Sequence, residues 1–143
     1  MAQYDHLPVF KKSYDLLLAV FQSVTNFGKE YKYTIGENLK KETLEIIVSI
    51  YQANSRVEKC AMIIQAKEHL ELARLYIRIS KDLKQITLKK MIFLNEFIES
   101  IAKQLTGWEK MVNVPKAGVV AVKAVASVQI QSNSLPHIER GGK

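Results

Sequence analysis

The stretch that decides the fold is Gln65–Leu83, which reads QAKEHLELARLYIRISKDL. At about 100° per residue in a helix, four of its residues fall on one narrow apolar face: Ala66, Leu70, Ala73 and Ile77. A second apolar face lies roughly opposite and holds Ile64, Leu72, Leu75, Ile79 and Leu83. A helix that packs on a single bundle needs only one apolar stripe. The second face therefore predicts an oligomer interface, with Leu72, Leu75 and Ile79 in the contact.

Four basic side chains lie between these two faces, within a sector of roughly 60°: Lys67, Arg74, Arg78 and Lys81. They are candidate nucleic-acid-binding residues, because guanidinium groups held on a rigid helix present a fork of N–H donors to phosphate. The alternative is a structural seam of local ion pairs, since Glu71 and Asp82 lie three or four residues from the arginines along the helix. From the residues alone, both interpretations stay open.

Two more helices are expected before this one. The first runs from Pro8 to about Phe27, and its expected buried face is Phe10, Tyr14, Leu17, Phe21 and Val24. The second begins at a capping box, Thr34–Glu37, and runs to about Asn54. Ser55–Glu58 repeats the capping pattern and predicts that the next helix starts near Arg56 and ends near Lys84. This close succession makes the second and third helices antiparallel neighbours.

The last helix follows Thr87, which is expected to be its N-cap. Its apolar residues step by three and four without a break: Met91, Leu94, Ile98, Ile101, Leu105 and Trp108. Four helices with short joints predict an all-α fold, an antiparallel up-down-up-down four-helix bundle over residues 1–113. Residues 114–143 have no helical stripe and carry four basic side chains against one acidic one, so we expect a basic, flexible C-terminal tail.

The composition and motifs argue against an enzyme. The net charge of +7 and the pI of about 9.5 favour polyanionic partners such as nucleic acid. His6, His69, His137 and Cys60 share no metal-ligand spacing, and the sequence has no glycine-rich phosphate loop or nucleophile motif. We therefore expect no catalytic residue, no metal and no cofactor. A single cysteine and the lack of a long apolar run predict a cytoplasmic protein without a membrane partner.

Two segments of the chain resemble a known family. Leu72–Leu83, with Arg74 and Arg78 four apart among aromatic and aliphatic residues, resembles the third helix of the accessory variability determinant (Avd) proteins of diversity-generating retroelements. The end of the fourth helix is similar to the Leu-x-Gly-x-Trp-like close of that family, and here it consists of Leu105, Thr106, Gly107 and Trp108, followed by Val112 and Asn113. The likeness spans about Tyr14 to Asn113.

The resemblance implies a four-helix bundle that assembles as a homopentameric barrel with a basic surface. Such proteins bind the retroelement reverse transcriptase and RNA, possibly DNA as well, and support mutagenic retrohoming without catalysis of their own. It also implies that Arg74 and Arg78 are basic contacts, to which helical geometry adds Lys67 and Lys81.

Two alternatives remain. One is a bundle protein of the type encoded in 23S rRNA intervening sequences, although Ile50–Asn54 departs from the Asn-Ile-Ala-Glu-Gly-like ending of its second helix. The other is a helical protein-protein scaffold that never binds nucleic acid.

Overall fold

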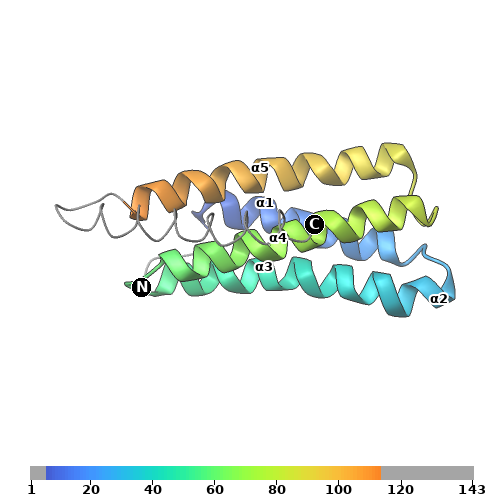
Figure 1. The fold of residues 1–143 in the computed structure, drawn as a ribbon, viewed down its shortest axis with the longest axis horizontal. Coiled ribbons are helices and arrows are strands. Elements are labelled where there is room, and N and C mark those ends of the chain that lie inside the picture. The colour runs from blue at the N-terminus through green and yellow to red at the C-terminus, as the bar shows by residue number, and fades with distance from the viewer. Residues whose placement is uncertain (1–5, 114–143) are drawn as a thin grey trace, which may run out of the picture. The chain divides into compact units, whose positions relative to one another are not determined.

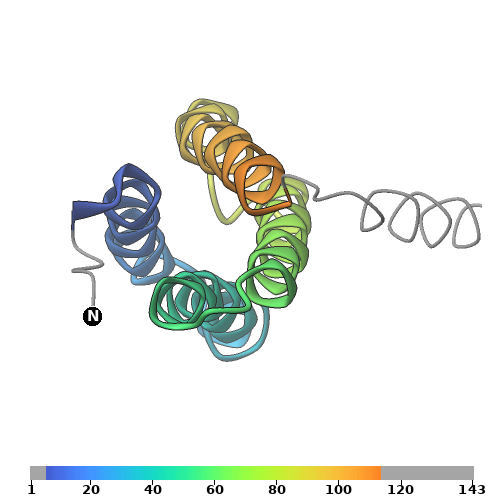
Figure 2. The same cartoon turned by 90° about the vertical axis from the view of Figure 1, so that its left-hand side faces the viewer.

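The computed structural model describes residues 6–113, which form four long helices and a short helical lead-in to the second of them. Their bounds are α1 Pro8–Val24, α2 Lys29–Tyr31, η2 Lys32–Gly36, α3 Glu37–Ser55, α4 Cys60–Asp82 and α5 Leu88–Val112. Helix α1 packs against α3 and α5, and α4 packs against the same two helices from the other side (Figures 1 and 2). The predicted up-down-up-down bundle is confirmed. The predicted tail, residues 114–143, lies outside the described residues.

The core consists of aliphatic side chains from all four long helices, together with Phe27 from the segment between α1 and α2. The narrow face predicted for α4 is buried as expected, because Ala66, Leu70, Ala73 and Ile77 are at most 1% exposed. The stripe predicted for α5 is also buried at its centre, at Leu94, Ile98, Ile101 and Leu105. None of the helices in residues 6–113 is long and apolar enough to span a bilayer.

The face predicted for α1 was wrong by about one position. Val24 is buried as predicted, but Tyr14 and Phe21 are 46% and 42% exposed. The buried face consists of Val9, Ser13, Leu16, Val20, Ser23 and Val24. Two serines lie in this face, and each hydroxyl donates to the carbonyl four residues earlier, Ser13 to Val9 at 2.7 Å and Ser23 to Ala19 at 2.8 Å. A buried serine satisfied by its own helix is invisible to a count of apolar residues.

The expected capping box at Thr34–Glu37 does not form. Helical structure already begins at Lys29, after Gly28, whose carbonyl accepts hydrogen bonds from the N–H groups of Tyr31 and Lys32. Thr34 therefore lies inside a helical turn, where its hydroxyl donates to the Glu30 carbonyl at 2.8 Å. The wider π-helical turn η2 joins α2 to α3 without a break.

The second capping pattern, Ser55–Glu58, was also wrong. Ser55 is the last residue of α3 rather than a cap of α4, and α4 begins four residues later than expected, at Cys60. The ammonium group of Lys59 donates to the carbonyls of Ala53, Asn54 and Arg56 at 3.0, 3.2 and 2.7 Å. A lysine at this position satisfies the carbonyls that the end of α3 leaves unpaired.

The turn between α4 and α5 has a well-defined geometry. The N–H of Lys84 donates to the Lys81 carbonyl and that of Gln85 to the Ser80 carbonyl, the hydrogen-bond pattern of a Schellman motif. Lys84 occupies the left-handed position, with φ 63°. Thr87 then caps α5 as predicted, because its hydroxyl accepts from the N–H of Lys90 at 3.0 Å.

Candidate functional site

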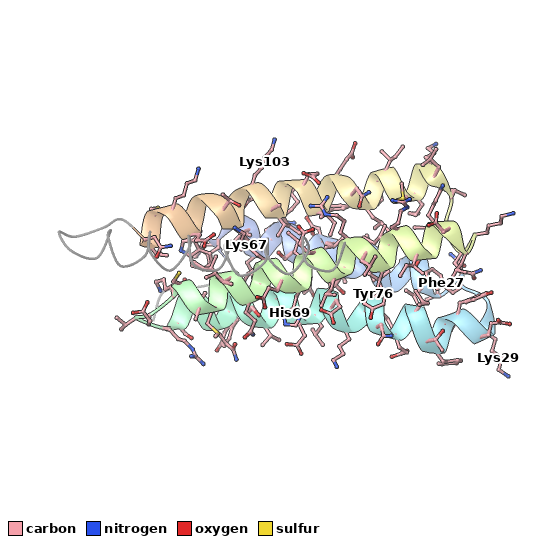
Figure 3. The ribbon with its side chains drawn as sticks, in the orientation of Figure 1. Phe27, Lys29, Lys67, His69, Tyr76 and Lys103 are labelled. Carbon is pink, nitrogen blue, oxygen red and sulfur yellow. The ribbon has the colours of Figure 1, made fainter. Side chains whose placement is uncertain are left out.

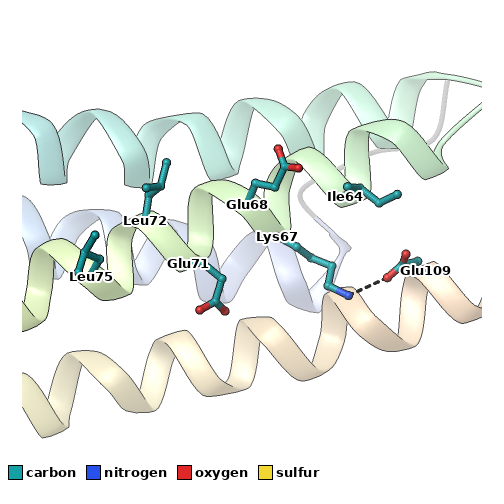
Figure 4. A pocket seen from close by; sticks show the side chains of 7 residues that line it. All are labelled: Ile64, Lys67, Glu68, Glu71, Leu72, Leu75 and Glu109. Carbon is teal, nitrogen blue, oxygen red and sulfur yellow. Dashed lines mark hydrogen bonds and ion pairs between the residues drawn. The ribbon is translucent and has the colours of Figure 1, made fainter. Parts of the chain in front are cut away.

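The second apolar face of α4 points away from the core. Leu72 and Leu75, two of the predicted interface residues, are 41% and 51% exposed, whereas Ile79 is half-buried. We define the α4 outer face as the exposed apolar side chains Ile64, Leu72 and Leu75 with the acidic side chains Glu68 and Glu71. These residues line a surface groove beside α5, into which Lys67 and Glu109 also project (Figure 4).

The basic stripe predicted for α4 is divided by its ion pairs. Lys67 reaches across to Glu109 of α5, with 2.7 Å between the nitrogen and the carboxylate oxygen (Figure 4). Arg74 also bridges to α5, where Nη1 donates to Glu99, and it contacts Glu71 on its own helix at 3.2 Å. Both cations therefore form ion pairs that link α4 to α5 within the chain.

The bridge from Arg74 to Glu99 shifts the titration of both groups. Burial disfavours the charged guanidinium, but hydrogen bonds to Glu99 and Glu71 outweigh it and raise the pKa of Arg74. The hydrogen bond and charge of Arg74 in turn lower the pKa of the Glu99 carboxyl below its ordinary value of 4.5. The ion pair is consequently charged across the neutral range.

The other two predicted basic residues, Arg78 and Lys81, lie within about one turn of the end of α4. Arg78 contacts Asp82 at 3.4 Å and Lys81 lies 3.9 Å from the same carboxylate, so two cations share one acid. The side chain of Arg78 is 71% exposed. Exposed ion pairs of this kind contribute between 0 and about 1 kcal/mol, and a phosphate can compete for these two side chains more easily than for Lys67 and Arg74.

A second outward apolar surface was missed by the sequence reasoning. Exposed apolar side chains follow α1 and α3 at steps of four and three, and we call this set the α1–α3 outer face: Leu18, Phe21, Leu44 and Val48. Lys40 lies over the Phe21 ring at 5.1 Å, and Lys41 lines the same hollow. The signal was present, because α1 carries more apolar positions than one stripe requires.

His69 has a structural partner. Its Nδ1 lies 2.6 Å from Oε1 of Glu42, and the two side chains connect α4 to α3 in a half-buried position. Within residues 6–113, no three His, Cys, Asp or Glu side chains are placed to hold a metal ion.

Two comparisons with known proteins bear on this bundle. A search of curated proteins gives no match for the chain. A family model described as bAvd-like matches residues 8–112, which is the four-helix bundle from the first residue of α1 to the last of α5. The chain belongs to the bAvd-like family, the Avd-type accessory proteins of diversity-generating retroelements.

Proposed function

We propose that this protein is a non-enzymatic accessory protein of a diversity-generating retroelement that binds the reverse transcriptase and its template RNA during mutagenic retrohoming. The observation that carries the proposal is the family match across the whole bundle. Family membership indicates a retroelement accessory protein and association with a reverse transcriptase. Binding of RNA is our extension of it, supported by the net charge of +7.

The proposal includes self-assembly through the two outer faces. The α4 outer face has apolar side chains beside Glu68 and Glu71, and the α1–α3 outer face has apolar side chains beside Lys40 and Lys41. Glu71 and Lys40 are each paired within the chain, with Arg74 and Glu37, which leaves Glu68 on one face and Lys41 on the other. Two different faces with complementary charges of this kind suit a head-to-tail contact, and such contacts close into a ring when the rotation between subunits allows it. We propose that the ring is the homopentamer implied by the Avd resemblance.

A charge exchange tests this contact. Glu68→Lys puts like charges into the interface, and so does Lys41→Glu, so each single variant is expected to sediment as a smaller species than the wild type. The double variant restores opposite charges between neighbouring subunits and is expected to recover the assembly. Both residues are exposed in the single chain, so circular dichroism should show folded helices in every variant. Failure of the double variant to recover would count against this pairing of faces.

For RNA binding, we propose that Arg78 and Lys81 contact phosphate directly, and that Lys67 and Arg74 contribute where they can exchange Glu109 and Glu99 for a phosphate oxygen. Phosphate contacts of this type are independent of sequence and weaken steeply with salt. Arg74→Ala with Arg78→Ala is expected to weaken RNA binding and to flatten its salt dependence. The matched control is Arg56→Ala with Lys110→Ala, two exposed cations near the other end of the bundle.

The same measurements separate this function from a pure scaffold. A retroelement accessory protein is expected to co-purify with the reverse transcriptase of its own element and to bind the template-repeat RNA. A helical scaffold would bind neither, and its interactions would not respond to removal of Arg78. Loss of co-purification after disruption of the ring by Glu68→Lys would indicate that binding of the reverse transcriptase requires assembly.

A further inference from the structure

The net positive charge of the bundle is concentrated at one end. Residues 26–34 and 78–90 hold seven basic and two acidic side chains, whereas the rest of residues 6–113 hold ten of each. These two segments contain the α1–α2 loop and the α4–α5 turn, which lie at the same end of the bundle (Figure 1). We call this surface the basic end: Lys29, Lys32, Arg78, Lys81, Lys84, Lys89 and Lys90.

Hydrogen bonds through one side chain join the two segments, so their lysines lie on one surface. The N–H of Gly28 donates to Oε1 of Gln85 at 2.7 Å, and Nε2 of Gln85 donates to the Leu83 carbonyl at 2.9 Å. One glutamine side chain thus bridges the loop that precedes Lys29 and the turn that carries Lys84. Lys29 projects from this end of the molecule (Figure 3).

Most of these cations have no acid to neutralise them. Among residues 6–113, no carboxylate lies within ion-pair distance of Lys29, Lys32, Lys84 or Lys89, and Lys90 packs on the Phe93 ring at 5.1 Å. Surface hollows lie on both sides of residues 85–87, one lined by Lys81 and Lys84 and the other by Lys90. Asp82 also lines the first hollow and is shared by Lys81 and Arg78, so the unpaired cations of the basic end are Lys29, Lys32, Lys84 and Lys89. A cluster of unpaired cations on one surface is typical of a polyanion site.

The backbone conformation of Lys84 is a second, independent indication that the basic end has a function. It occupies the left-handed C′ position of the Schellman motif, where glycine is the favoured residue because a β-carbon is disfavoured at positive φ. The fold would therefore be served at least as well by glycine. A strained residue whose side chain is exposed and unpaired is a reason to look for function in that side chain.

We propose that the basic end binds the phosphate backbone of RNA, with Lys84, Lys29 and Lys89 as direct phosphate contacts around the Gln85 bridge. This inference rests on the proposed RNA binding and assigns it to the end of the bundle instead of the middle of α4. Arg78 and Lys81 belong to the same surface, whereas Lys67 and Arg74 are paired with Glu109 and Glu99 of α5 and contribute only where a phosphate displaces those carboxylates.

Lys84→Gly separates binding from folding. Glycine relieves the positive φ, so the thermal midpoint is expected to stay equal or rise while RNA binding weakens. The triple variant Lys29→Ala, Lys84→Gly, Lys89→Ala is measured by fluorescence anisotropy with polyuridylate at several salt concentrations. Each phosphate contact removed from a single strand reduces the slope of log K against log salt by about 0.7, so we expect a slope smaller by about 2 for the triple variant.

The control is Arg56→Ala, Lys103→Ala, Lys110→Ala, which removes the same charge from exposed positions outside both the basic end and the two outer faces. If both triple variants lose affinity equally, net charge and not the basic end explains binding, and the inference is overturned. It is likewise overturned if polyglutamate competes as well as RNA of equal charge, because the surface would then suit acidic protein.

If wild type binds polyuridylate and only Arg74→Ala reduces it, this inference fails while the proposed function stands. If wild type does not bind RNA at low salt, this inference and the RNA-binding part of the proposed function both fail.

Discussion

The N–H of Gly28 donates a 2.7 Å hydrogen bond to the side-chain carbonyl of Gln85, across 57 positions of sequence. This contact joins the start of α2 to the turn after α4. Gln85→Ala leaves that N–H without its partner and is expected to lower the free energy of unfolding by about 1 kcal/mol. Hydrogen exchange at Gly28 should quicken.

Gln22→Ala is the control for that prediction, because Gln22 is an exposed residue near the end of α1 that lines the adjacent hollow. Its stability is expected to stay within about 0.5 kcal/mol of wild type. Equal losses in the two variants would show that the bridge contributes no specific stability.

Two glycines in helical segments should respond oppositely to alanine. At Gly36 a β-carbon would lie 2.7 Å from Cγ1 of Val24 and 3.2 Å from the Tyr31 carbonyl, because η2 approaches α1 closely there. Gly36→Ala is expected to destabilise the bundle by roughly 1–3 kcal/mol through overpacking.

At Gly107 a β-carbon would meet nothing within 4 Å. Gly107→Ala is expected to stabilise α5 by up to about 1 kcal/mol, since alanine is the better helix former. Urea unfolding of both variants measures the difference. A destabilised Gly107→Ala would indicate that something outside residues 6–113 approaches this position.

Local periodicity predicted the elements whose packing depends on apolar side chains alone. The buried face of α4 was correct because Ala66, Leu70, Ala73 and Ile77 repeat at helical spacing with no polar residue among the four. Periodicity did not predict the buried face of α1, because the buried Ser13 makes its hydrogen bond within its own helix. Burial there depends on hydrogen bonding and not only on hydrophobicity.

Contacts between distant segments were beyond sequence reasoning. Both capping boxes were expected from three-residue spacing. The helical segment instead starts after Gly28, whose N–H is bound by the distant Gln85, and Lys59 binds the carbonyls at the end of α3. The sequence left two roles possible for the basic residues of α4, local ion pairs or phosphate contacts. The partners of Lys67 and Arg74 on α5 could not be identified without the fold. The excess charge of the basic end, by contrast, was countable from the sequence.

The Arg74 to Glu99 bridge predicts a particular acid sensitivity. Because Arg74 lowers the pKa of Glu99 in the folded chain, the stability from this pair is present above the carboxyl's ordinary value of 4.5 and is lost as pH falls through the lower folded value. Glu99→Gln is therefore expected to lose less stability than wild type between about pH 5 and pH 3.

The measurement is urea unfolding at each pH. Glu96→Gln is the control, since it leaves the bridge to Arg74 intact and should follow the wild-type profile. The effect is expected to be modest because the Glu99 side chain is 58% exposed. Identical pH profiles for Glu99→Gln and wild type would mean that the bridge does not persist in solution.

Two neighbouring residues of α4 should separate folding from assembly. Ile77 is fully buried in the bundle, so Ile77→Ala is expected to cost about 2–5 kcal/mol of folding free energy through lost burial and a cavity. Leu75 is 51% exposed on the α4 outer face, so Leu75→Ala is expected to change the stability of the single chain by less than about 0.5 kcal/mol. It should nevertheless weaken subunit association about tenfold, because burial of a leucine at a contact is worth roughly 1.5 kcal/mol or more. Sedimentation at several protein concentrations measures subunit association, and urea unfolding of the dissociated chain measures folding stability. If the Leu75→Ala protein assembles like wild type, the subunit contact lies on another face.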